Sequence, residues 1–512
     1  MHASPIRWVE SHFILKWGTW LFLSALCLLG LLCYLNFPLG YNQTVYHYMG
    51  TVLKDGGAPY RDFVDRKGPF GLLIYGLAAV SFGESDLAYR FFDWLILFCI
   101  GICLYKFIRK AFAPLAAFGG ATLWFMHTLL DGPGNTGDVT NLIVLGVLAA
   151  TILLESPNVV RLFVVGFVTA AIGWVKPTAW LIVSPMLIYT LKYERQSLGK
   201  SLTFIACGFV LFSGLIISHL YYTRALTGFY EAVVLDPILA YVPKTQFILS
   251  HNVRGFAKWL LADPVFRIGG LLGLFWGKAA TSALRLARLA VIGGLLTVFV
   301  ESRFWPYHFT PILPFLAFGA LIGLQRLREF FSNKSSQKLK PAGVGSAAIG
   351  IFLLFLPPLI FIGKDLRLIY SSAPNSENRA ELFVLPDLAQ MYRDRLQVVQ
   401  TLRPLLRSED EIYVLGSDPG IYLALQKRAF CRHANPGDLL YDYTKVNSPA
   451  HRQRWRAEIL AYLQNRQPDW LIVDQNLWEH IDAEAKQAIA AVMEKFYENP
   501  ECVASYWLYH KI

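Results

Sequence analysis

The stretch WGTWLFLSALCLLGLLCYL, residues 17–35, decides the fold class. It contains about 20 predominantly apolar residues and no charge, which is long enough to cross a hydrocarbon core of roughly 30 Å. Residues 1–16, which precede it, are more polar, and no small-residue cleavage site of a secretory signal follows it. The sequence therefore predicts an uncleaved first transmembrane helix.

The composition of the whole chain agrees with a membrane protein. Of the 512 residues, 55% are hydrophobic and only 16% are charged, whereas about one-quarter of an average soluble domain is charged. The formal net charge is +11, but Lys and Arg lie in short clusters between apolar runs and not in a basic tract with interleaved aromatic residues. We therefore expect a polytopic membrane protein, and we expect no nucleic-acid partner.

Ten further apolar segments occur before residue 363 and predict, with the first, about 11 transmembrane helices. They are residues 87–108, 111–129, 141–154, 160–174, 178–191, 201–221, 268–276, 289–300, 311–324 and 344–362. With a cytoplasmic amino terminus, the basic clusters all fall on the cytoplasmic side, as the positive-inside rule requires. The carboxy-terminal region then lies outside the cytoplasm.

The chain changes character after residue 363. Apolar strand-like runs at 411–416 and 468–475 alternate with helix-like stretches at 388–402, 452–466 and 482–496. This pattern predicts a transmembrane domain over 1–363 and an extracytoplasmic α/β domain over 364–512. Cys431 and Cys502 lie in the second domain, where a disulfide and two free thiols are open alternatives.

The first outer loop, residues 36–86, is large and polar. Its apolar segment 69–82 is short for a span, and counting it as one would invert all later loops, so we expect 43–54 and 69–82 to be juxtamembrane helices. Charged and polar side chains gather in this loop: Asn42, His47, Asp55, Asp62, Asp65, Arg66 and Lys67. Carboxylates there can act as a general base and cations can hold a phosphate. A solvated loop held by ion pairs is the alternative interpretation.

Polar groups of other outer-face loops lie at predicted helix ends: Asp138, Lys176, Arg303, Tyr307 and His308. Ionisable residues near membrane depth are costly and by default indicate a functional site. Each also has a simpler interpretation, because Lys176 and Arg303 can snorkel and Asp138 can cap a helix. Their location on one face favours a shared function.

Four short motifs occur in a characteristic order. They are G-x-PY-x-D at residues 57–62, D-x-K-x-P at 65–69, W-x-KPTA at 174–179 and F-x-PYH-F-x-P-x-LP at 304–314. Their order and the predicted topology resemble the GT-C superfamily of membrane glycosyltransferases over residues 15–324. The bacterial branch that is similar to protein O-mannosyltransferases and lipid A aminoarabinose transferases fits best.

The resemblance implies a function. Such enzymes take a sugar from a polyprenyl-phosphate donor and pass it, with inversion, to an acceptor hydroxyl of a glycan, lipid or protein on the periplasmic face of the bacterial inner membrane. It implies no cofactor, and a divalent metal is left open. The implied donor phosphate-binding residues are Lys67, Arg66, Arg303, Tyr307, His308 and Lys176, and the implied substrate-binding residues are Asn42, His47 and Asp55.

The family's usual acidic residue after the first helix corresponds here to Asn42, which cannot accept a proton at neutral pH. We therefore expect Asp65, two residues from Lys67, to be the general base, with Asp62 and Asp138 as alternatives. A transporter or flippase of lipid-linked sugars, or a non-catalytic binder of them, is the alternative function.

Overall fold

A computed structural model of the protein describes residues 13–193, 198–241, 249–279, 281–302, 304–333, 340–372, 376–440 and 449–512. The chain divides into two compact units, each made of three segments. The helical unit contains Met1–Phe37, Asp93–Gly214 and Phe247–Ser371, and the mixed unit contains Pro38–Phe92, Leu215–Gln246 and Ser372–Ile512. The first outer loop and the carboxy-terminal region thus belong to one unit.

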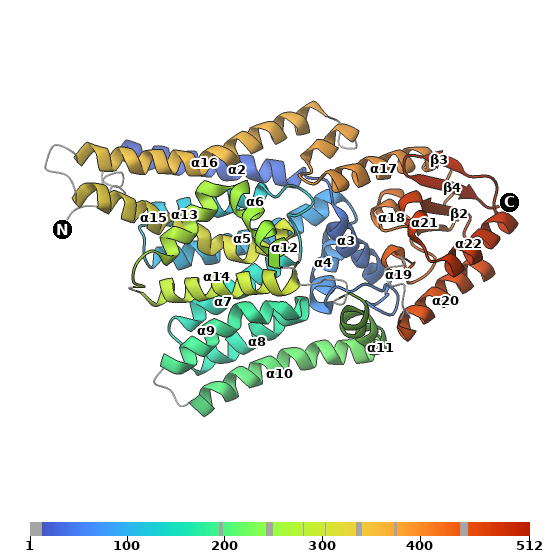
Figure 1. The fold of residues 1–512 in the computed structure, drawn as a ribbon, viewed down its shortest axis with the longest axis horizontal. Helices are drawn as coiled ribbons and strands as arrows, with labels where there is room; N and C mark the ends of the chain where they lie inside the picture. Colours follow the sequence, from blue (N-terminus) through green and yellow to red (C-terminus); the bar gives the residue numbers. More distant parts are fainter. Residues whose placement is uncertain are drawn as a thin grey trace. The chain divides into compact units, whose positions relative to one another are not determined.

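The helical unit holds the predicted membrane-spanning segments (Figure 1). Its helices, some of which continue into the mixed unit, are α2 (Phe13–Leu35), α5 (Asp86–Arg109), α6 (Pro114–Leu129), α7 (Thr140–Leu154), α8 (Val159–Val175), η1 (Pro177–Ala179), α9 (Trp180–Tyr193), α10 (Leu198–Tyr222), α12 (Leu249–Ala262), α13 (Pro264–Phe275), α14 (Ser282–Glu301), η5 (Pro306–Ile312), α15 (Leu313–Asn333) and α16 (Lys340–Ser371). Each of the 11 predicted spans coincides with one of these helices.

Six helices in the described part of the chain are long and apolar enough to cross a membrane. They lie at Trp17–Leu35, Asp86–Arg109, Leu198–Tyr222, Ser282–Glu301, Pro306–Phe330 and Ile349–Ser371. Shorter apolar helices accompany them, including α7, α8 and α13. The prediction of a polytopic helical membrane protein is confirmed, whereas the number of 11 crossings stays a prediction.

Small residues let two of these helices approach closely. A Cβ added at Gly273 of α13 would overlap the carbonyl oxygen of Gly319 in α15. Close backbone approach at small residues drives helix association in membranes, where apolar side chains gain little by leaving lipid. α16 packs beside α15 and continues beyond residue 363 to Ser371, where the helical unit ends.

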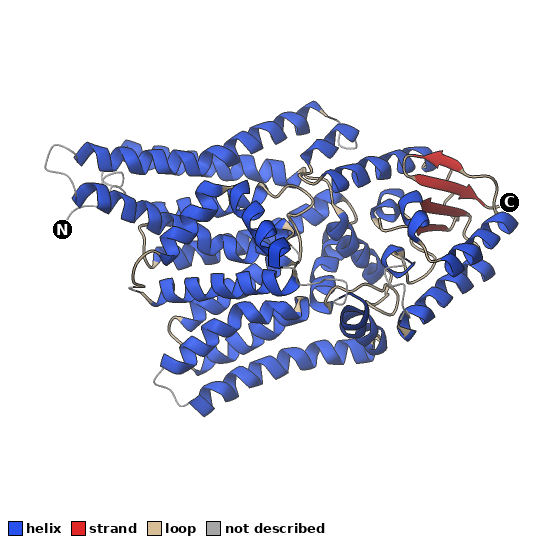
Figure 2. Cartoon of the chain, viewed as in Figure 1, coloured by secondary structure: helices blue, strands red, loops and turns tan. Residues whose placement is uncertain are grey.

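The mixed unit contains the only strands in the described part of the chain, and Figure 2 shows them in red near the carboxy terminus. Its elements are α3 (Tyr41–Lys54), α4 (Pro69–Phe82), α11 (Leu226–Phe229), η2 (Tyr230–Leu235), η3 (Pro237–Tyr241), η7 (Glu377–Leu382), α17 (Pro386–Leu402), β1 (Ile412–Leu415), α18 (Gly420–Leu425), α19 (Gly437–Leu440), α20 (Ala450–Asn465), β2 (Trp470–Asp474), α21 (Gln475–His480), α22 (Ala483–Phe496), β3 (Glu501–Val503) and β4 (Tyr506–His510).

The two helices predicted in the first outer loop are present as α3 and α4. They pack against each other where Gly50 meets Gly76, because a Cβ on Gly50 would lie 2.4 Å from the carbonyl oxygen of Gly76. This close approach fixes α3, whose first turn carries Asn42 and whose buried side includes His47.

The carboxy-terminal α/β domain is also confirmed. Its sheet has the order β1-β2-β4-β3, with β1 and β2 parallel and the other pairs antiparallel. In register, Ile412 pairs with Trp470 and Val473 pairs with Trp507. β1 is buried along its whole length, as expected for the central layer of an α/β unit.

Candidate active site

Lys67 occupies a site built by the first outer loop. Its ammonium nitrogen lies 5.4 Å from the ring centroid of Tyr41 and 5.5 Å from that of Tyr46, both on α3. The same nitrogen is 3.6 Å from Oδ1 of Asp65, and that oxygen accepts the backbone N–H of Lys67 at 3.0 Å. We call Lys67, Asp65, Tyr41 and Tyr46 the lysine site. Two aromatic faces and a carboxylate hold the ammonium, which is only about one-fifth exposed.

The backbone of the lysine site is held by Tyr60. This completely buried residue donates its hydroxyl proton to the carbonyl oxygen of Lys67 at 2.6 Å. Its own backbone is left-handed, with φ of 65°, an uncommon conformation for a bulky residue. The turn is completed by Asp62, whose Oδ2 accepts the backbone N–H of Ala58 at 2.8 Å. Asp62 is exposed and also pairs with Arg61, so its contacts are those of a turn-forming residue.

Arg66 and Asp55 contribute to ion pairs that tie the loop to the rest of the mixed unit. Nε of Arg66 lies 2.6 Å from Oδ2 of the fully buried Asp236, which also accepts hydrogen bonds from Arg452. Asp55 accepts from Nε of Arg428 at 2.6 Å. Both residues therefore connect the first outer loop to other segments of its unit.

Asn42 and His47 lie on α3 beside this site. Asn42 is half-buried in the first turn of the helix. His47 is completely buried and meets the ring of Tyr89 edge-on at 5.4 Å. Burial lowers the pKa of His47, so its imidazole is neutral at pH 7 and contributes no cation to the site.

A second cluster, in the helical unit, centres on Glu301 at the end of α14. Oε2 of Glu301 lies 2.6 Å from the Lys176 ammonium and 3.3 Å from Nδ1 of His308. Its other oxygen accepts the hydroxyl of Thr178. We call Glu301, Lys176, Thr178 and His308 the Glu301 cluster. The structure thus brings together Lys176 and His308, two residues predicted from separate loops.

Sequence reasoning missed Glu301, although it lies only three residues before the motif that contains His308. Tyr307 lies edge-on against His308 at 4.4 Å. Asp138 is buried, and its Oδ1 accepts the backbone N–H of Thr140, the first residue of α7, at 3.2 Å. Arg303 lies outside the described residues.

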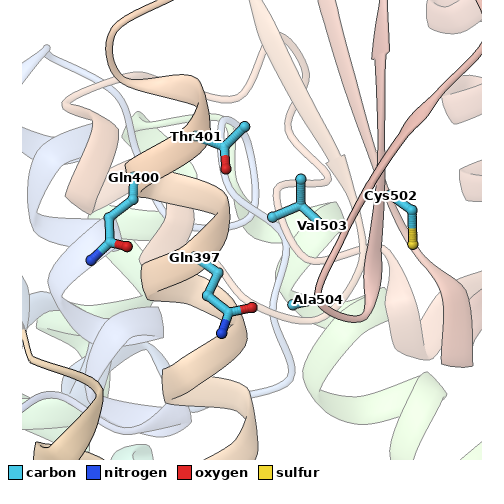
Figure 3. A pocket seen from close by; sticks show the side chains of 6 residues that line it. All are labelled: Gln397, Gln400, Thr401, Cys502, Val503 and Ala504. Atoms are coloured by element: carbon cyan, nitrogen blue, oxygen red, sulfur yellow. The ribbon is translucent and has the colours of Figure 1, made fainter.

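A shallow pocket of about 460 Å³ lies in the mixed unit, apart from the predicted site residues. In Figure 3 the side chains of Gln397, Gln400 and Thr401 project from α17 beside Val503 and Ala504. Cys502 also lines the pocket, and both it and Cys431 are free thiols. The alternative of a disulfide between them is therefore not the state seen here.

No group of three or more His, Cys, Asp or Glu residues in the described part of the chain could hold a metal ion. The cations of both clusters are paired with carboxylates, and each cluster could exchange part of that pairing for an anionic ligand.

The fold is shared with a protein of known structure. No protein-family model matches the sequence, and no curated protein matches it at a significant level. The chain is similar to the crystal structure of ArnT from Cupriavidus metallidurans in the apo state, with 12% identity, a TM-score of 0.56, and coverage of 97% of this chain and 98% of ArnT. The structure of ArnT from the same organism bound to undecaprenyl phosphate matches with 12% identity, a TM-score of 0.56, and coverage of 96% and 97%. The chain therefore shares the fold of ArnT over nearly its whole length.

Proposed function

We propose that this protein transfers a sugar from a polyprenyl-phosphate donor to an acceptor hydroxyl at the outer face of a bacterial inner membrane. The observation that carries the proposal is the lysine site, in which a mostly buried ammonium stands beside a carboxylate. The shared fold supports it, because ArnT has been crystallised with undecaprenyl phosphate.

Lys67 is suited to the lipid phosphate. Its nitrogen is 3.6 Å from Oδ1 of Asp65, which is beyond ordinary hydrogen-bond length, so the carboxylate does not saturate the three donors of the ammonium. The rings of Tyr41 and Tyr46 hold the cation without satisfying those donors. A phosphate oxygen can therefore form a charge-assisted hydrogen bond with Lys67.

Asp65 is suited to act as the base. Both contacts of Asp65 described above use Oδ1, and a carboxylate has a second oxygen that can accept a proton. In the proposed step, Asp65 takes the proton of the acceptor hydroxyl while that oxygen attacks the anomeric carbon. The carbon–oxygen bond to the phosphate breaks, and the electron pair leaves on the lipid phosphate, whose charge Lys67 stabilises. The configuration of the sugar is inverted.

We also propose that the Glu301 cluster of the helical unit can bind an anion. Lys176 and His308 share the single carboxylate of Glu301. When His308 is protonated, the cluster therefore carries two positive charges and one negative charge. Such a cluster can receive an anion without a cation leaving its helix. Arg66 is assigned to bracing the loop through Asp236.

The test is a transfer assay with the full-length protein in lipid nanodiscs and radiolabelled polyprenyl-phosphate hexose or pentose donors. Asp65→Asn should lower the transfer rate by about 10²- to 10⁴-fold, the usual contribution of a general base. It should still bind undecaprenyl phosphate. Asp62→Asn is the matched control in the same loop, because Asp62 forms a turn. Full activity of Asp65→Asn would overturn its assignment as base.

The second candidate is a non-catalytic binder of lipid-linked sugars, which the amide at Asn42 favours. In that case the wild-type protein would bind the donor but would transfer no labelled sugar to any acceptor. Movement of labelled lipid across a vesicle bilayer would instead identify a transporter. Each outcome contradicts the transfer proposal.

A further inference from the structure

A segment of the carboxy-terminal region, residues 428–437, lies along the first outer loop. We call it the strap. At one end, the backbone N–H of Ala429 donates to the Tyr48 hydroxyl at 2.8 Å. In the middle, the carbonyl oxygen of Arg432 accepts the backbone N–H of Val64 at 3.0 Å. The loop that carries Lys67 is therefore directly contacted by the carboxy-terminal region.

Near the end of the strap, Asn435 reaches the lysine site. Its Nδ2 donates to the hydroxyl of Tyr41 at 2.6 Å, and the ring of Tyr41 is one of the two that face the ammonium of Lys67. Asn435 is buried, with 9% of its surface exposed. One hydrogen bond and one ring face thus connect Asn435 to Lys67.

Residues on both sides of Asn435 are held in place. The carbonyl oxygen of His433 accepts the hydroxyl of Tyr413 at 3.0 Å, and Nε2 of His433 lies 2.8 Å from Oε2 of Glu458. The backbone N–H of Gly437 donates to the carbonyl oxygen of Gly416 at 3.1 Å. Because the backbone is held on both sides, the side-chain amide of Asn435 starts from a fixed position and can orient Tyr41.

The amide of Asn435 adds little to stability. Its Nδ2 gains a hydrogen bond, but its Oδ1 is buried without a hydrogen-bond partner among the described residues. A satisfied hydrogen bond stabilises the folded protein, whereas a buried acceptor without a partner destabilises it. The two effects on stability oppose each other. The main effect of the Asn435 amide is therefore to orient Tyr41.

We propose that Asn435 is a positioning residue of the lysine site, through which the carboxy-terminal domain sets the affinity for the donor phosphate. By donating to the Tyr41 hydroxyl, the amide fixes the ring face that holds the Lys67 ammonium. It also directs the Tyr41 O–H proton away from Asn435. This inference rests on the proposed binding of a polyprenyl phosphate by Lys67.

The test measures binding of undecaprenyl phosphate and of neutral undecaprenol to the full-length protein in nanodiscs. Asn435→Ala should weaken binding of the phosphate about fivefold, the loss expected when one hydrogen bond no longer orients the site. It should leave the affinity for undecaprenol and the Tm unchanged. A merely structural role would weaken binding of both lipids and lower the Tm.

Two further variants make the test specific. Tyr41→Phe removes the same hydrogen bond from its other end, so the double variant with Asn435→Ala should be no weaker than either single variant. Arg428→Ala loosens the strap at Asp55 and Glu84 without touching the lysine site, and it should leave phosphate affinity unchanged.

The outcomes separate this inference from the proposed function. A wild-type protein that binds undecaprenyl phosphate no better than undecaprenol contradicts the proposed function. A wild-type protein that prefers the phosphate, with Asn435→Ala equal to it, overturns only the role of Asn435. An equal loss in Arg428→Ala also overturns that role, because docking of the strap would then be the cause.

Discussion

Lys176 and Glu301 form an ion pair in which the ammonium nitrogen lies 2.6 Å from Oε2 of the carboxylate. The two residues are far apart in the sequence: Lys176 follows α8, and Glu301 is the last residue of α14. Thr178 and His308 bind the same carboxylate. The carboxylate of Glu301 therefore holds together the segments that carry Lys176, Thr178 and His308.

Replacing Glu301 by Gln should destabilise the protein. The carboxylate is largely buried and the Lys176 side chain is about one-third exposed, so loss of the partner leaves a cation that water solvates only in part. We expect a loss of about 1–3 kcal/mol, between the values for exposed and fully buried pairs. The measurement is the Tm of the protein in detergent.

The matched control is Glu329→Gln, which removes an exposed carboxylate of the same unit that accepts from Gln325. Its Tm should equal that of the wild type. If Lys176→Ala together with Glu301→Gln is as unstable as the two single losses added, the pair is not coupled and this interpretation is wrong.

The sequence predicts the helices well because their signal is local. Each long apolar run became a helix, and the short run at Pro69–Phe82 became α4. The juxtamembrane position of α4, expected from its length and from the basic clusters, stays a prediction. β3 escaped prediction because it has three residues, of which Glu501 and Cys502 are exposed, so no alternating pattern exists to be read.

The site was predicted less completely because its signals are not local. Lys67 and Asp65 are two residues apart, and their proximity follows from the sequence. Glu301 meets Lys176, and Asn435 meets Tyr41, only because distant segments pack together. Asn435 looks like an ordinary loop residue in the sequence, and the only local signal for Glu301 is that it lies three residues before the motif that contains His308.

The buried carboxylate of Asp236 should make the protein sensitive to acid. Burial alone would raise the pKa of Asp236, but the hydrogen bond from Arg452 and the charges of Arg66 and Arg452 lower it to about 2 from an ordinary 3.8. A carboxyl whose pKa is lower in the folded state stabilises the fold above its ordinary pKa and loses that effect as the pH falls. The stabilisation, about 2 kcal/mol from the size of the shift, should disappear between about pH 4 and pH 2.

Asp236→Asn tests this expectation in a series of Tm measurements from pH 7 to pH 2.5. The variant should be less stable than the wild type at pH 7, and the difference should shrink below pH 4. Arg454→Gln, which removes a largely exposed partner of Glu231 in the same region, should leave the shape of the pH profile unchanged. A constant difference across the whole range would show that Asp236 does not titrate as described.

The two cysteines of the carboxy-terminal domain should react as separate thiols. Cys431 is buried, and burial raises its pKa to about 11, whereas Cys502 is exposed on β3. A maleimide should therefore label Cys502 in the folded protein and Cys431 only after denaturation. A reductant should not change the Tm. Mass spectrometry that finds the two residues linked in the folded protein would contradict the structure.

Lys67 should bind the lipid phosphate through its charge and its position together. Lys67→Gln keeps a donor of similar length but removes the charge, and we expect affinity for undecaprenyl phosphate to fall roughly 10- to 100-fold, as for loss of a charge-assisted hydrogen bond. Lys67→Arg keeps the charge, but its planar guanidinium does not match a space set for a compact ammonium between Tyr41 and Tyr46. It should recover only part of the affinity.

Lys54→Gln, which removes a half-exposed lysine paired with Glu84 on the same loop, is the control and should bind like the wild type. Equal affinity in Lys67→Gln and the wild type would exclude Lys67 from the phosphate site.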